Sequence, residues 1–206
     1  MNTRKILESS RGYDPIPLDD FWYKNRVIFF NEEFTRSSCT DLIAQLLDLE
    51  RDDPGKPITI YIDSPGGSVT EGLAVYDVMT SIKSPVTTVC LGMAASMGAL
   101  IFLGGSRRIM LRRSKLLIHD PYISDGSSGK PLTMKEQLEK LMKTREELAT
   151  IISERTGQTI EWVYDKTKTD YIMEAEEALA CGACTNLASF DPDDDGYIFA
   201  GVGESA

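Results

Sequence analysis

The stretch ITIYIDSPGGSVTEGLAVYDVM at residues 58–79 decides the fold class. It begins with a short β-branched and apolar run, passes through two adjacent glycines, and continues into a helical pattern. That pattern opens with Ser68 and Glu71, and a serine three residues before a glutamate is the capping box that starts many helices. A buried strand followed directly by a helix is the unit from which parallel sheets are built. The stretch therefore predicts an α/β protein.

Three further runs predict strands, at 26–30 (RVIFF), 86–92 (VTTVCLG) and 115–119 (KLLIH). Between the first of them and residue 58 lies a helical pattern, SSCTDLIAQLLDLERDD, with a start signal from Ser38 to Asp41. Strands that alternate with helices predict a parallel sheet with right-handed crossovers.

The second half of the chain predicts a long helix from Leu132 to Arg155, with Thr133 and Glu136 as its capping box and Gly157 as its stop. Its apolar stripe is too long for a crossover, so we expect it to need a partner. The stripe consists of Met134, Leu138, Leu141, Met142, Leu148 and Ile152. Beyond it, residues 159–182 predict two short helices around a tight connection at TKTDY (167–171).

Composition narrows the class of partner and the location. The 206 residues carry a net charge of −10, and the best basic cluster is only RRIMLRR at 107–113, which disfavours nucleic acid. No segment approaches the roughly 20 apolar residues of a membrane helix. The first residues also lack the apolar run of a signal peptide. We therefore expect a cytoplasmic protein without a membrane span.

Cys181 and Cys184 have the spacing of a zinc or redox pair, but a structural zinc site requires four ligands. The only histidine, His119, lies more than 60 residues away. We expect reduced, buried thiols and no metal.

The acidic segment 189–206 also carries a metal-like pattern. Asp191, Asp193 and Asp195 open a calcium-loop pattern, but Val202 stands where a bidentate glutamate belongs. We expect a solvated, partly disordered tail and no calcium site.

Ser96 lies among small residues at the end of a predicted strand, directly before a helix that begins at Met97. This places its hydroxyl at a helix start, with the next backbone N–H where an oxyanion would form. His119 follows a parallel strand, so both side chains should emerge at one edge of the sheet, next to Gly66 and Gly67. A helix cap for the serine and a structural role for the histidine remain alternatives.

The segments YIDSPGGSVTEGLAVYDVM, LGMAASMGALI and KLLIHDP, in this order, resemble the ClpP family, the proteolytic subunit of the ATP-dependent Clp protease. The resemblance covers about residues 21–188, including the segment 153–182. It implies a ClpP/crotonase-like fold of repeated ββα and βα units with a protruding handle, a strand plus the long helix, at about 122–156. Residues 1–20 resemble the axial loops of the family, and 189–206 form a separate tail.

The resemblance also implies roles. Ser96 falls on the nucleophile, His119 on the general base and Asp170 on the acid that orients the imidazole, while the backbone N–H groups of Gly67 and Met97 fall on the oxyanion hole. These roles suit the chemistry, because a serine hydroxyl needs a base to take its proton and a carboxylate fixes the tautomer of that base.

One departure adjoins the predicted site. Asp120 stands where the family commonly has glutamine, and we expect its negative charge either to favour the protonated form of the histidine or to compete with Asp170 for it.

The resemblance implies a homo-oligomer of two stacked heptameric rings that degrades unfolded polypeptides with a Clp-type AAA+ ATPase unfoldase. A paralogous ClpP subunit is a further partner that it allows. The chain has no Walker motif, so ATP belongs to the partner and we expect no cofactor here. Two alternatives stay open: a low-activity paralogue that serves as a structural ring subunit, and a crotonase-like acyl-CoA enzyme.

Overall fold

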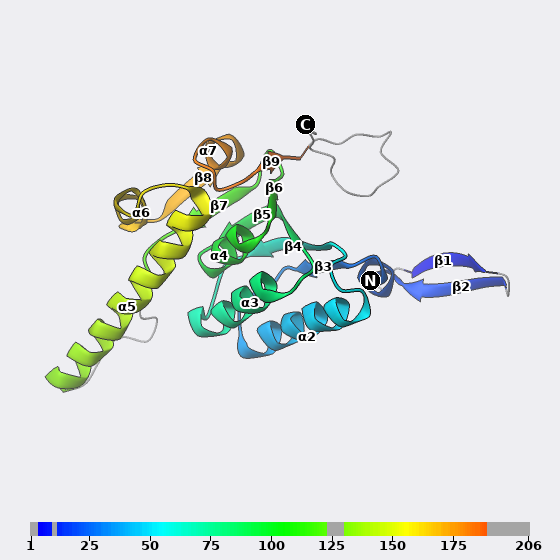
Figure 1. Cartoon of the computed structure of the whole chain (residues 1–206), viewed down its shortest axis with the longest axis horizontal. Coiled ribbons are helices and arrows are strands. Elements are labelled where there is room, and N and C mark those ends of the chain that lie inside the picture. Colours follow the sequence, from blue (N-terminus) through cyan, green and yellow to red (C-terminus); the bar gives the residue numbers. More distant parts are fainter. Residues whose placement is uncertain (1–3, 10–11, 123–129, 189–206) are drawn as a thin grey trace.

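Strand β5 (Val86–Ala95) is the hub of a seven-stranded sheet in the computed structural model, which describes residues 4–9, 12–122 and 130–188 (Figure 1). On one side β5 pairs with β4 (Ile58–Ser64). On the other side its first half pairs with β6 (Arg107–Met110) and its last residues with β7 (Lys115–Ile118), all in parallel. The sheet therefore forks at β5, and β7 ends beside the end of β5.

Three strands complete the sheet: β3 (Val27–Phe30) beside β4, β9 (Asn186–Leu187) beside β6, and β8 (Tyr171–Glu174) antiparallel to β7. All four strands expected from the sequence are present, and the α/β class is confirmed. The expectation of two short helices around TKTDY is wrong in one respect. Between α6 (Ile160–Thr167) and α7 (Ala175–Ala180) the chain forms β8, because β7 offers it a strand edge to pair with.

Helices α2 (Arg36–Asp52), α3 (Val69–Ser81) and α4 (Met97–Gly104) are the crossovers of the sheet (Figure 1). Ser68 caps α3 as expected, since its hydroxyl accepts the Glu71 N–H. The start of α2 is earlier than expected: Thr35 is its cap, and Ser38 is the reciprocal partner inside the first turn. All eight residues of α4 are buried, so the helix that follows Ser96 is fixed inside the core.

Helix α5 (Pro131–Thr156) confirms the predicted long helix and projects from the rest of the molecule (Figure 1). Its start differs from the expectation, because Pro131 occupies the first position after Lys130 and no side chain caps it. Gly157 ends it as predicted, with a left-handed φ of 74°. The expected apolar stripe divides in two. Leu148 and Ile152 are buried in this chain and Leu141 is half-buried, while four other large apolar residues nearer the start of the helix are exposed: Leu132, Met134, Leu138 and Met142.

The amino-terminal segment forms the β1 (Arg4–Ser9) and β2 (Gly12–Pro17) hairpin and helix α1 (Leu18–Lys24). The hairpin lies at the end of the molecule opposite α5 (Figure 1). The predicted acidic tail at 189–206 lies outside the described residues. Within the described ranges, no helix is both long and apolar enough to cross a membrane.

The basic cluster at 107–113 has a structural use. The guanidinium of Arg108 donates to the carbonyl oxygens of Gly105, Arg155, Gly182 and Ala183. Burial, and then the charge of Arg155, lower the pKa of Arg108. This arginine therefore ties the carboxy-terminal elements to the sheet.

Candidate active site

Ser96 has a strained backbone at the turn from β5 to α4. Its φ is 54° and its ψ is −118°, and it is one of two non-glycine residues with positive φ in the described part of the chain. Such a conformation in a serine between strand and helix is the geometry of a nucleophile elbow. Although Ser96 occupies the N-cap position, its side chain makes no capping hydrogen bond. The helix-cap alternative therefore loses its support.

His119 lies at the same edge of the sheet as Ser96, as the sequence predicts. Ala95 pairs with Leu117 across β5 and β7, and the Ser96 N–H donates to the Leu117 carbonyl at 2.8 Å. Both Ser96 and His119 line one groove of about 750 Å³. Its other lining residues are Glu33, Phe34, Thr35, Pro65, Gly66, Gly67, Ser68, Val69, Pro121 and Tyr122.

The two glycines after β4 have to be glycines. A Cβ on Gly66 would lie 2.7 Å from the Ser96 Cβ, and one on Gly67 would lie 2.5 Å from the Phe34 carbonyl oxygen. Both residues have positive φ, 101° and 143°. Phe34 fixes this loop, because its N–H donates to the Gly66 carbonyl and its carbonyl accepts the Ser68 N–H, both at 2.8 Å.

Two backbone N–H groups beside Ser96 are available to a ligand. Within the described structure, neither the Gly67 N–H, in the loop after β4, nor the Met97 N–H, at the start of α4, has a hydrogen-bond partner. These are the two donors that the resemblance assigns to an oxyanion hole.

Asp170 does not hold the His119 ring. The antiparallel register of β7 and β8 ends with Ile118 opposite Tyr171, and His119 and Asp170 are the next residues along the two segments. The Asp170 residue is exposed, and in the described part of the chain no hydrogen bond joins its carboxylate to the imidazole or the imidazole to Ser96. The ring Nδ1 instead lies 2.8 Å from the main-chain carbonyl oxygen of Asp120.

The expected competition from Asp120 takes a different form, because the main chain and not the carboxylate meets the ring. The Asp120 carboxylate accepts hydrogen bonds from Arg145 Nε and the Thr167 hydroxyl, both at 2.6 Å. Arg145 and Thr167 are functional candidates that the sequence analysis missed, and no local pattern marks them.

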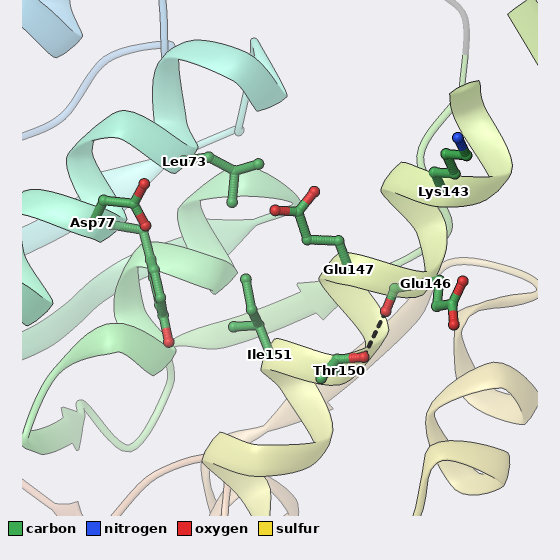
Figure 2. Close-up of a pocket in the computed structure, with 8 residues that line it drawn as sticks. Leu73, Asp77, Lys143, Glu146, Glu147, Thr150 and Ile151 are labelled. Carbon is green, nitrogen blue, oxygen red and sulfur yellow. Dashed lines mark hydrogen bonds between the residues drawn. The ribbon is translucent and has the colours of Figure 1, made fainter.

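A second hollow lies between α3 and α5 and has a volume of about 460 Å³ (Figure 2). Three carboxylates line it, those of Asp77, Glu146 and Glu147, together with Leu73, Tyr76, Lys143, Thr150 and Ile151. It brings no histidine or cysteine to its carboxylates. We therefore take the groove at Ser96 as the candidate active site.

The cysteines are free thiols. Burial raises the pKa of Cys90 and of Cys184 to about 11, which makes both poor nucleophiles and poor metal ligands near neutral pH. Among the residues that the structure describes, no three His, Cys, Asp or Glu side chains are grouped to hold a metal ion. The calcium pattern at Asp191, Asp193 and Asp195 falls outside them.

A serine on a strand-to-helix turn, an imidazole in the same groove and unpaired backbone donors beside them define the serine hydrolase class of site. The comparison with protein families supplies the group within that class. A family model described as Clp protease matches residues 14–189, and the chain belongs to this family.

Proposed function

We propose that the protein is a serine endopeptidase in which Ser96 is the nucleophile, His119 the general base and Asp170 the acid that supports it. The backbone N–H groups of Gly67 and Met97 bind the oxyanion. The observation that carries this proposal is the positive φ of Ser96 in one groove with the sole histidine. Membership of the Clp protease family supports a ClpP-type peptidase over an acyl-CoA enzyme.

The proposed assembly is two stacked heptameric rings that enclose the active sites in the cytoplasm. Unfolded polypeptides enter with the help of a Clp-type AAA+ ATPase, and this chain needs no cofactor of its own. The exposed apolar residues near the start of α5 support a partner there, because a helix face with Leu138 and Met142 in water is costly.

A fluorophosphonate probe and small fluorogenic peptides test the chemistry. The wild-type chain is expected to be labelled at Ser96, whereas Ser96→Ala and His119→Ala abolish both labelling and peptide hydrolysis while the fold remains. Ser106→Ala, which removes an exposed serine away from the groove, is the matched control and should be labelled normally. Labelling at another residue, or full turnover in either site variant, contradicts the assignment.

A second candidate is a structural ring subunit of low activity. It is favoured by one observation, that the His119 ring is bonded to a main-chain carbonyl and not to Ser96 or Asp170. A wild-type chain that assembles with an active paralogue but takes no probe supports this candidate against the first.

A further inference from the structure

The groove at Ser96 is lined by one carboxylate, that of Glu33. Among the described residues that line the groove, the ionisable side chains are Glu33, His119 and Tyr122. Glu33 is exposed, and in the part of the chain that the structure describes its carboxylate forms no ion pair and no hydrogen bond. The groove therefore contains a negative charge that no lysine or arginine of its described lining balances.

Main-chain hydrogen bonds fix the position of Glu33 beside the glycine loop. The Glu33 carbonyl accepts the Ser38 hydroxyl at 2.7 Å, and the next residue, Phe34, bonds to the loop through both its N–H and its carbonyl. The Glu33 Cγ lies 2.9 Å from the position that a Cβ on Gly67 would take. The side chain of Glu33 thus starts directly beside the residue whose N–H we assign to the oxyanion hole.

The other charges of this segment do not neutralise Glu33. The side chain of Arg36 is 88% exposed, and its Nε lies 3.6 Å from the Glu71 carboxylate, so it already faces another anion. Glu32 adds a further negative charge, although it is not among the residues that line the groove. Residues 32–36 and Glu71 together carry three carboxylates and one guanidinium. This side of the groove therefore has an excess of negative charge.

A peptide with a lysine or an arginine near its cleavage point fits this charge. A scissile carbonyl bound at the Gly67 N–H lies beside Glu33, and each residue of an extended peptide adds only about 3.5 Å, so side chains within two residues of the bond can reach the carboxylate. An ammonium or guanidinium group there gains a charge-assisted hydrogen bond, whereas a carboxylate is repelled. The bound cation also offsets the repulsion between Glu33 and the oxyanion.

We propose that Glu33 is a specificity-determining residue that makes the groove prefer peptides with a lysine or an arginine within two residues of the scissile bond. The inference rests on the proposed peptidase function for the position of that bond. The preference itself can also be measured by binding, without turnover.

The test uses internally quenched peptides of one sequence that carry lysine, norleucine or glutamate at each position in turn, from two before to two after the scissile bond. Norleucine has nearly the shape of lysine without its charge. At one or more positions, kcat/KM for lysine should exceed that for norleucine by about threefold at low salt, the size of an exposed ion pair, and that for glutamate by about tenfold. The preference should weaken as salt screens the pair.

Four variants locate the source of the preference. Glu33→Gln should bring the three peptides to within about a factor of two of one another, and Glu33→Lys should reverse their order. Glu32→Gln is the matched control, because it removes the neighbouring charge outside the groove lining and should keep the wild-type preference. Ser96→Ala should bind the lysine peptide more tightly than the glutamate peptide, and it should lose this difference when Glu33→Gln is added.

The outcomes are distinct. Equal cleavage of the lysine and norleucine peptides at every position, or equal binding where there is no cleavage, overturns the inference. A preference that Glu33→Gln leaves unchanged also overturns it, and a changed sedimentation of that variant then assigns the carboxylate to a contact between subunits. A wild-type chain that takes no fluorophosphonate and cleaves no peptide, but whose Ser96→Ala variant binds lysine peptides through Glu33, supports the inference and contradicts the proposed function.

Discussion

Replacing Ser96 with glycine is expected to stabilise the fold while it ends catalysis. The reason is the backbone of this residue, whose φ of 54° and ψ of −118° suit glycine better than any residue with a Cβ. Ser96→Ala removes the same hydroxyl but keeps the Cβ, so it is the matched control. The two variants differ only in whether the strain is released.

The size of the effect follows from two opposing contributions. A non-glycine residue in a sparsely populated region costs about 1–3 kcal/mol. Glycine gains extra freedom in the unfolded chain, which destabilises the folded state by about 0.5–1 kcal/mol. The net gain of Ser96→Gly over Ser96→Ala is therefore about 1 kcal/mol, which corresponds to about 2–4 °C in a domain of this size.

Urea unfolding and calorimetry on both variants, at one protein concentration, measure this difference without interference from changes in assembly. Ser96→Ala should lie within about 0.5 kcal/mol of the wild type, because the hydroxyl makes no capping bond. A glycine variant that is no more stable than the alanine variant refutes the idea that strain is stored at this residue.

Three other changes have defined outcomes. Gly66→Ala places a Cβ 2.7 Å from the Ser96 Cβ at a φ of 101°, so it should destabilise the fold by about 2 kcal/mol and abolish fluorophosphonate labelling; normal labelling contradicts this. Leu138→Glu with Met142→Glu changes residues that are 57% and 50% exposed, so melting of the subunit should hardly change, whereas sedimentation should show single rings or smaller species. A particle of unchanged size with full peptidase activity contradicts the role of α5 in assembly. The Cys90 thiol, with its pKa raised to about 11 by burial, should be only about one thousandth ionised at pH 8. It should therefore resist an aromatic disulfide reagent until the pH rises toward 11 or the protein unfolds, and rapid reaction at pH 8 disproves the burial argument.

The strands that the sequence predicts well are those covered on both faces, because burial leaves a continuous apolar run such as that of β4. Strand β8 has no continuous apolar run that would predict it from the sequence. Its Ile172 is 46% exposed and its Glu174 is exposed, and only its pairing with β7 makes it a strand. Strand β6 is also hard to predict from the sequence, because an arginine such as Arg108 is typical of an exposed segment. In the structure its guanidinium donates to main-chain carbonyl groups instead.

Part of the candidate site, the proximity of Ser96 and His119, can also be predicted from the sequence. The meeting of Ser96 and His119 follows from parallel strands that end at one edge. The contacts of Asp120 do not, because Arg145 is 25 residues away and Thr167 is 47 residues away, on two different helices. A single sequence records no distance between such residues, and the meeting of three elements depends on the packing of α5 and α6.

Strands β7 and β8 pair in the fold but are far apart in the sequence, so they are synthesised at different times. His119 leaves the ribosome about 50 residues before Asp170, an interval of about 3–10 s at usual rates of synthesis. During that interval the chain already carries Ser96 and its elbow sequence, but the strand that pairs with β7 and the helix end that bonds to Asp120 have not been made. The order of the chain therefore leaves the proposed site of a nascent subunit incomplete until β8 and the end of α6 have been made.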